Sequence, residues 1–266
     1  MKFSLLGLFP DIPEIDILDI GAAAIGEWPV YKPMTDNGAC TVTGFEPSPE
    51  EYDKLLLFPD PRVRFFPFAL GDGEIAELKI FKYAGLTSLR EPNTAVTVGI
   101  LGNPDFGIIE KRALIRTYRL DDVADIADIN PDYIKIDVQG SELDILRHGV
   151  DTLSNALVVQ VEVNFIPFYI GQPLFGTIDV FMHRAGFVFH KFREMHCTQS
   201  QMYWTDAIYV RDFTQIKTMA IPQRLKLARI LWEIYETIDI TLLALAGIKI
   251  SGVDCAETFR NKLEAE

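Results

Sequence analysis

The sequence predicts an α/β fold: a mostly parallel sheet that ends in a C-terminal antiparallel hairpin, followed by a helical extension. Short apolar runs rich in β-branched residues alternate with longer segments, as in a sheet that helices cover on both faces. The last two runs, 187–192 and 202–210, are joined by a connection too short for a crossover helix, which favours antiparallel pairing. After residue 211, apolar residues recur at helical spacing.

The elements of the N-terminal half follow from apolar runs and turn signals. IDILDI (15–20) ends at Gly21 and is predicted to be the first central strand. A helix of about two turns is predicted to begin after Ser48, with Pro49 in its first position and Glu51 closing a capping box. The other strands predicted in this half are CTVTGFE (40–46) and RVRFFPFAL (62–70).

The segment from about 76 to 120 is predicted to be a β-hairpin inserted beside the sheet. Its two alternating runs, 76–83 and 113–120, flank a loop rich in Gly, Pro, Asn and Thr. This pattern indicates a peripheral antiparallel pair, and the insertion is a candidate wall for a site.

The C-terminal half repeats the strand and helix pattern. Strands are predicted at 133–138, 156–163, 187–192 and 202–210, and helices at 121–126, 140–150, 178–187 and, as one or two helices, 225–248. We therefore expect one α/β domain over 1–211 and a helical extension over 212–266. The extension is expected to pack on the body or on a partner, which leaves a homodimer open.

Length and composition are those of an ordinary globular protein. The chain has 266 residues, of which 48% are hydrophobic and 24% charged. The formal net charge of −13 repels phosphate backbones and anionic membrane surfaces, so nucleic acid is not an expected partner. The apolar segment 240–250 is too short to span a bilayer and is predicted to be a buried helix.

The cysteines and histidines give no sign of a disulfide framework or a metal site. The three cysteines are widely spaced without a CxxC pair, and a cytoplasmic location fits them best. The four histidines lack ligand spacing, so no metal is expected. His190 lies in a predicted strand and is interpreted as structural, whereas His196 lies in a predicted loop, where a substrate role stays open.

The loop from Asp19 to Gly26 follows the first strand, at the sheet edge where open α/β folds bind their ligands. Small residues there allow the backbone to approach a cofactor closely. The glycines do not form G-x-G-x-x-G, and Glu27 stands where a phosphate-binding P-loop needs Lys. The alternative is a tight connection with no binding role.

Two acids follow the next strands. Glu46 ends the second strand, where a carboxylate can accept hydrogen bonds from both hydroxyls of a ribose. The alternative is a solvated acid at the end of a strand. Asp72 follows the third strand and is a candidate partner of an adenine amino group, although Gly71-Asp72-Gly73 is also an ordinary turn sequence.

The run YIKIDVQGSE (133–142) carries the densest set of candidate residues. Lys135 and Asp137 share one face of a strand among apolar neighbours, so each needs a partner, and each is a candidate partner of the other. Their place at the carboxyl end of a central strand favours a functional role over a structural ion pair. Glu142 is either a helix-dipole acid or a contact residue. Glu162 and Asn164 close the next strand and are candidates to line the same cleft.

Taken together, these segments resemble the FkbM-type methyltransferases over roughly residues 14–210. The resemblance rests on DILDIGA (16–22), GFEPSPEEYDKL (44–55), FALGDG (68–73), LTSL (86–89), YRLDDV (118–123), YIKIDVQGSELDILRHG (133–149) and LVVQVEV (157–163). It implies the class I Rossmann-like methyltransferase fold, S-adenosylmethionine as the cofactor, and O-methylation of a hydroxyl on a sugar or secondary metabolite.

The resemblance also implies roles for individual residues. Asp19, Gly21 and Ala22 would bound the methionine part of the cofactor, Glu46 would bind its ribose and Asp72 its adenine edge. Asp137 would lie near the transferred methyl group. Our hypothesis is that Asp137, or a nearby residue such as Glu162 or His196, serves as the base or orients the acceptor.

The first loop departs from the family pattern, which keeps rival functions open. Ala23 stands where the family usually has Asn, Gly26 comes one residue late, and Gln139 replaces a commoner Glu. The altered loop favours, as an alternative, a binding or assembly protein of the same fold that has lost catalysis. A nicotinamide-dependent oxidoreductase is the third alternative, and the missing third glycine disfavours it.

Overall fold

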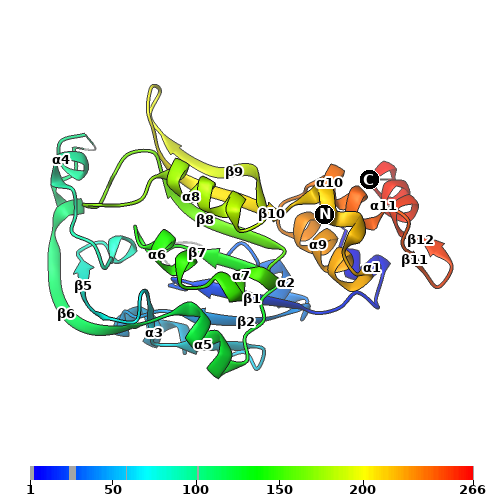
Figure 1. Cartoon of the computed structure of the whole chain (residues 1–266), viewed down its shortest axis with the longest axis horizontal. Helices are drawn as coiled ribbons and strands as arrows, with labels where there is room; N and C mark the ends of the chain where they lie inside the picture. The colour runs from blue at the N-terminus through cyan, green and yellow to red at the C-terminus, as the bar shows by residue number, and fades with distance from the viewer. Residues whose placement is uncertain (1–2, 24–27, 58, 101, 266) are drawn as a thin grey trace.

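The computed structural model describes residues 3–23, 28–57, 59–100 and 102–265, without the side chains of 125–127; Gly26 and Glu27 lie outside the described residues. Its centre is a seven-stranded sheet with the order β3-β2-β1-β7-β8-β10-β9 (Figure 1). The first five are parallel, and β10 runs antiparallel to both neighbours. The strands are β1 Ile15–Ile20, β2 Cys40–Phe45, β3 Val63–Phe66, β7 Tyr133–Ile136, β8 Val158–Asn164, β9 Phe187–Cys197 and β10 Met202–Arg211. The predicted mostly parallel sheet with a closing antiparallel hairpin is confirmed.

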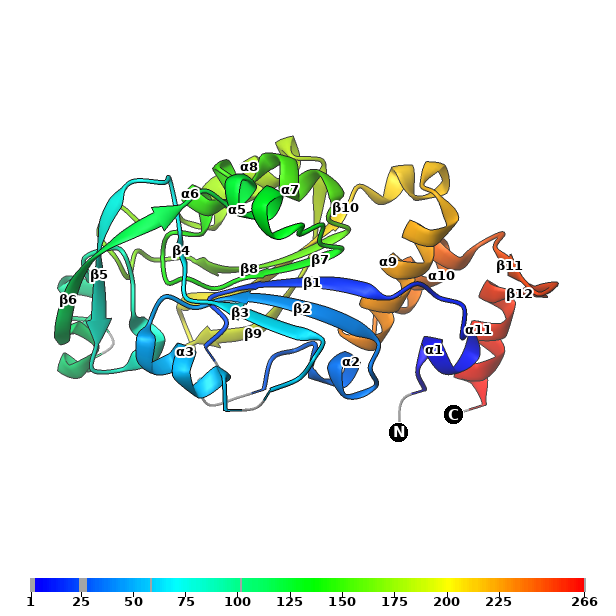
Figure 2. The same cartoon turned by 90° about the horizontal axis from the view of Figure 1, so that it is seen from below.

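Helices cover both faces of this sheet. Figure 2 shows α5 to α8 stacked on one face, with α2 and α3 on the other. The helices of the α/β body are α2 Lys32–Asp36, α3 Pro49–Leu55, α5 Leu120–Ala127, α6 Glu142–Arg147, α7 Val150–Asn155 and α8 Phe175–Arg184. Leu18, Ile134 and Val161 are fully buried against the face that α5 to α8 cover. Such continuous apolar strands are typical of a parallel sheet covered on both faces.

The other face of the sheet changes from apolar to polar side chains along the parallel strands. Near the amino-terminal ends of the parallel strands they are apolar, as at Val158, and Tyr133 joins the same buried cluster. Positions two residues apart in a strand share a face, and the next residues of this face are Lys135 in β7 and Gln160 in β8. The polar half of this face therefore lies toward the carboxyl ends, where the apolar packing of the core stops.

The insertion forms a three-stranded sheet at one end of the molecule. Here β5, Ile75–Phe81, pairs antiparallel with β6, Ile109–Tyr118, as predicted, and β4, Ala69–Leu70, pairs parallel with β6. Figure 1 shows this sheet beyond the carboxyl ends of the parallel strands. The remaining short helices of the insertion are η1 Ala84–Leu86, α4 Thr94–Thr97 and η2 Pro104–Gly107.

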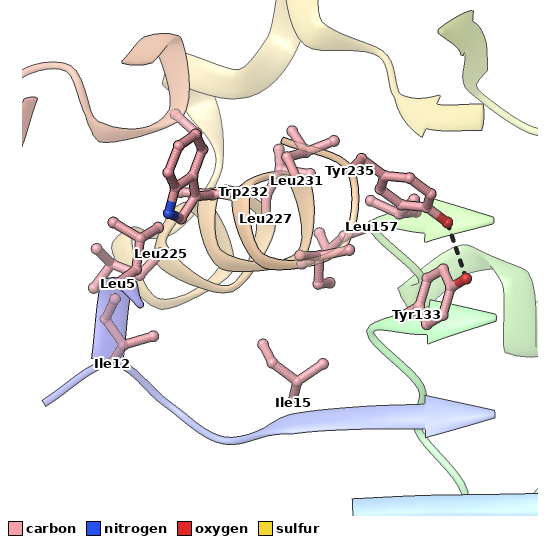
Figure 3. Close-up of a cluster of buried hydrophobic side chains, with 14 of the residues drawn as sticks. Leu5, Ile12, Ile15, Tyr133, Leu157, Leu225, Leu227, Leu231, Trp232 and Tyr235 are labelled. Atoms are coloured by element: carbon pink, nitrogen blue, oxygen red, sulfur yellow. Dashed lines mark hydrogen bonds between the residues drawn. The ribbon is translucent and has the colours of Figure 1, made fainter. Parts of the chain in front are cut away.

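The C-terminal extension packs at the opposite end, beside the N-terminus (Figure 1). One buried cluster joins it to the N-terminal segment and β1: the cluster contains Leu227 and Leu231 of the extension together with Leu5 and Ile15. Figure 3 shows these side chains around the helix that carries Leu227. The remaining elements are α1 Leu5–Leu8, η3 Phe213–Thr218, α9 Ile221–Glu233, α10 Ile238–Leu245, β11 Lys249–Ile250, β12 Val253–Asp254 and α11 Cys255–Glu264. Within the described residues, no helix has the length and apolar character needed to cross a membrane.

Four local predictions need correction. The predicted strand 62–70 is split into β3 and β4 at Pro67, and the predicted helix 140–150 is split into α6 and α7 at Gly149. Ser48 stands at the N-cap of α3, but its side chain makes no capping hydrogen bond. His196 lies in β9 rather than in a loop.

Shortening Leu231 to alanine is expected to lower the free energy of unfolding of the whole protein by about 3 kcal/mol. Leu231 is fully buried in the cluster that joins the extension to β1, so its loss leaves a cavity there. Denaturant titration followed by circular dichroism measures the change. Leu57→Ala is the matched control, because Leu57 is 70% exposed. A separate early transition for the extension would contradict a shared core.

Candidate active site

A cavity of about 280 Å³ lies at the carboxyl ends of β1, β2 and β7. One wall comes from the loops after these strands, and the other comes from the insertion, through Ala84, Ser88 and Leu89. We refer to it as the first cavity. Its position is the one at which an open, doubly wound sheet binds its ligand, and the insertion is a wall of it as predicted.

Gly21 allows the loops after β1 and β7 to come into contact. Its φ of +80° is in the left-handed region, and a Cβ there would lie 1.8 Å from the carbonyl oxygen of Asp137. Its backbone N–H donates to the carbonyl of Phe45 at 3.0 Å, and the N–H of Asp137 donates to that of Ile20 at 2.9 Å. The close approach leaves the cavity floor free of a side chain, which only glycine permits.

Glu46 extends from the end of β2 and lines the first cavity. Its side chain is buried, and Oε1 accepts a hydrogen bond from the backbone N–H of Ser48 at 2.7 Å. Burial raises the pKa of Glu46 to about 7, although backbone hydrogen bonds from Ser48 and Ala23 oppose the shift. The carboxylate is therefore fixed in orientation, with acceptor capacity left for a ligand.

Asp19 is the buried acid near the carboxyl end of β1. The Tyr31 hydroxyl donates to its Oδ2 at 2.5 Å, and Lys135 Nζ lies 3.4 Å from Oδ1. Burial raises the pKa of Asp19, and the charge of Lys135 opposes this. The predicted pairing of Lys135 with Asp137 is also present, at 3.9 Å. Lys135 thus joins the acids at the ends of β1 and β7.

Gln139 connects Asp137 to Glu162. Its side-chain amide donates to Asp137 Oδ1 at 2.9 Å and to Glu162 Oε2 at 2.8 Å, and its own oxygen lies 3.1 Å from the Tyr169 hydroxyl. Burial and the nearby Asp137 raise the pKa of Glu162 well above its usual range. Glu162 therefore favours its protonated form, whereas the Asp137 side chain is 36% exposed and reaches the cavity.

The turn that carries Gln139 is held by the insertion. Gln139 has a φ of +58°, which is uncommon for a residue other than glycine. The Ser88 hydroxyl donates to the Gln139 carbonyl at 2.6 Å, and Arg90 Nε donates to the Gly140 carbonyl at 2.5 Å. Ser88 and Arg90 were not among the site residues predicted from the sequence, although the LTSL segment of the family resemblance contains the first and adjoins the second. Buried Glu142 accepts from the Gly140 N–H at 2.8 Å, so it serves the same turn.

The structure brings together most of the predicted site residues. Gly21, Glu46 and Asp137 line the first cavity, and Asp19 and Ala22 line a neighbouring one that also contains Asp137.

Asp72 lines none of the cavities described here. Its Oδ1 accepts from the N–H of Glu74 at 3.0 Å and lies 3.3 Å from the Thr117 hydroxyl. The hydrogen bond from Glu74 lowers the pKa of Asp72. These contacts favour the alternative interpretation of Asp72 as an ordinary turn residue.

A third cavity, of about 200 Å³, lies between the insertion and the ends of β8 and β10. It shares Gln139 with the first cavity. Its walls are largely aromatic, and Glu162 and Asn164 are its polar residues at the end of β8. Glu162 also lines the cavity that contains Lys135 and Asp137, as predicted, whereas Asn164 is not among the lining residues of that cavity. The aromatic lining residues are Phe106, Phe168, Tyr169 and Trp204.

Solved structures with a similar fold are methyltransferases of low sequence identity. Magnesium protoporphyrin IX methyltransferase from Synechocystis PCC 6803, with bound S-adenosylmethionine, aligns with a TM-score of 0.40 and 13% identity over 77% of this chain and 74% of that chain. A Burkholderia thailandensis 1,6-didemethyltoxoflavin-N1-methyltransferase with bound S-adenosylhomocysteine aligns with a TM-score of 0.38 and 10% identity over 78% and 74%. A comparison with curated proteins finds no significant match.

The family itself follows from a match over the sequence. The profile of the methyltransferase FkbM domain matches residues 19–189, which is more than half of the chain. The match begins at Asp19 and includes Gly21, Glu46 and Asp137, whose side chains or backbone line the first cavity. This chain belongs to the FkbM methyltransferase family.

Proposed function

We propose that the chain is an S-adenosylmethionine-dependent methyltransferase that methylates a hydroxyl group of a small molecule, such as a sugar or a secondary metabolite. The observation that carries the proposal is the buried Glu46 carboxylate at the end of β2, fixed by the Ser48 N–H within the first cavity. A fixed acceptor at this place suits the two hydroxyls of a ribose.

The residues of the first cavity fit the adenosine part of this cofactor. Glu46 would hold the ribose, and Phe68 and Leu70 supply apolar surface for the adenine ring. Gly21 leaves the floor open at the contact of the two loops. When bound, S-adenosylmethionine supplies an activated methyl group on a sulfonium centre.

Asp137 is the residue that we assign to the acceptor hydroxyl. Its carboxylate, oriented by Gln139, accepts the hydroxyl proton or orients the oxygen for in-line transfer. Glu162 is disfavoured as the base because burial favours its protonated form. The alignment of acceptor and methyl donor supplies the larger part of the rate enhancement in such a displacement.

The third cavity is the proposed place of the acceptor. Trp204 and Phe168 give flat apolar surfaces, and Asn164 and Glu162 give hydrogen-bonding groups. This combination suits a sugar ring, which has apolar faces and polar edges. Gln139 lines both this cavity and the first one, so acceptor and cofactor would meet beside Asp137.

Isothermal calorimetry with S-adenosylhomocysteine tests the cofactor assignment, and we expect a dissociation constant of about micromolar order. NAD is the comparison ligand, and we expect no binding. Absence of heat at millimolar S-adenosylhomocysteine would contradict the enzyme and favour a binding or assembly protein. Transfer of radiolabelled methyl groups to a panel of methyl glycosides then tests the acceptor class.

A further inference from the structure

A second cavity, of about 290 Å³, adjoins the first. The two share Ala23 and Asp137, so they meet where the loops after β1 and β7 touch. The second cavity continues over the polar half of the sheet face to β9 and β10. Its far side is built by Arg193 and Asp206, which lie beyond the segment 19–189 that defines the family.

Charges of both signs line this cavity. Its two cations are paired with acids: the half-buried Lys135 Nζ lies 3.4 Å from Asp19 and 3.9 Å from Asp137, and Arg193 Nε lies 2.7 Å from Glu194. The anionic side also includes Asp206, which pairs in register with Glu162 of β8. Acids outnumber the cations among the lining residues, so the cavity is complementary to a cationic group, such as the ammonium of a cofactor's amino-acid end.

Asp206 is held from the C-terminal extension. Gln160 Nε2 donates to Asp206 Oδ2 at 2.6 Å, and the Tyr235 hydroxyl lies 2.7 Å from Gln160 Oε1. Tyr235 follows α9, and its hydroxyl also lies 2.9 Å from that of Tyr133, the contact drawn in Figure 3. Tyr235 and Gln160 are buried, so the chain of hydrogen bonds is shielded from water. The extension therefore fixes the orientation of an acid that faces the second cavity.

Asp19 and Ala22, which the family resemblance assigns to the methionine part of S-adenosylmethionine, line this cavity. We propose that Asp206 is a further contact for the ammonium group of that part and that Tyr235 positions Asp206 through Gln160. This inference rests on the proposed use of that cofactor. It gives the C-terminal extension a part in cofactor binding, through residues outside the matched family segment. It also provides anchors for the amino-acid group in a chain whose first loop has Ala23 in place of the usual Asn.

Comparison of two ligands isolates the contribution of the amino-acid end to binding. S-adenosylhomocysteine carries the amino-acid group, and 5′-methylthioadenosine lacks it. Calorimetry is done at about pH 8, since burial raises the pKa of Asp206 to about 6 and the group is ionised above that value. Asp206→Asn is expected to lower the affinity for S-adenosylhomocysteine about tenfold and to keep the affinity for 5′-methylthioadenosine within about twofold of the wild type. Tyr235→Phe is expected to lower only the affinity for S-adenosylhomocysteine, by about threefold.

Tyr209→Phe is the matched control, because Tyr209 is a fully buried tyrosine of the same sheet whose hydroxyl lies 3.3 Å from Asp179 on the face covered by α8. It should change neither affinity by more than about twofold. An Asp206→Asn variant that keeps its full affinity for S-adenosylhomocysteine, or loses both ligands equally, would overturn the assignment. An unchanged Tyr235→Phe would overturn the role of the extension alone. Wild-type protein that binds neither ligand would instead refute the proposed function, and this inference with it.

Discussion

Replacing Glu46 with glutamine is expected to weaken S-adenosylhomocysteine binding by about 100-fold. The carboxylate offers two acceptor oxygens, whereas glutamine offers one oxygen and one donor group. One acceptor is already used by the Ser48 N–H at 2.7 Å, so the glutamine NH₂ would meet either this N–H or the ribose. Calorimetry with the variant and the wild type measures the difference, and a thermal unfolding profile shows that both are folded.

The same substitution is expected to remove a pH dependence. Burial raises the pKa of Glu46 to about 7, so the free protein holds a proton there below that pH. Ligand binding favours the ionised form, and wild-type affinity should therefore fall as the pH drops from about 8 to about 6. Glu46→Gln should show a much flatter profile over this range. Equal affinity of both proteins at the higher pH would refute the ribose contact.

Asp72→Asn serves as the matched acid-to-amide control in this titration. Its carboxylate is occupied in the turn with Glu74 and Thr117, and it lines none of the cavities described here. Its affinity for S-adenosylhomocysteine is expected to stay within about twofold of the wild type. A large loss would restore Asp72 as a contact for the adenine.

The central strands were predictable because each is a run of mostly apolar residues, which predicts a strand buried on both faces. Ile15–Ile20 has isoleucine or leucine on both faces of the strand, and five of its six residues are buried. The segment 62–70 is also largely apolar but is divided, because Pro67 lacks the N–H that a continuous ladder needs. The small hairpin of β11 and β12 has only two residues a strand, too few for a periodic signal.

The site was predictable where it depends on strand ends and not where it depends on distant contacts. Glu46 and Asp137 follow β2 and β7 directly, and parallel strands bring their carboxyl ends to one edge. The contact of Tyr235 with Gln160 joins residues 75 positions apart, and no local pattern contains it. The role of Gln139 depends likewise on a left-handed turn that the insertion holds in place.

Replacing Asp137 with asparagine is expected to lower methyl transfer about 100- to 1000-fold and to leave S-adenosylhomocysteine binding within about threefold. Asparagine keeps the shape and can still accept from Gln139, but it cannot take a proton from the acceptor. The measurement is the turnover of radiolabelled S-adenosylmethionine with a methyl glycoside that the wild type methylates. Full turnover would show that Asp137 serves only as a partner of Lys135.

Gln139→Glu separates the orientation of Asp137 from its chemistry. The new carboxylate would stand within hydrogen-bonding distance of both Asp137 and Glu162, where the native amide donates to each. Three adjacent acids cannot all ionise, so the proton affinity of the group rises and the pH–rate profile should move to higher pH. A merely structural role for Gln139 would lower stability without moving that profile. A displaced profile would show that the amide of Gln139 sets the proton affinity of the acids that it contacts, and the loss in Asp137→Asn would show that turnover requires the Asp137 carboxylate.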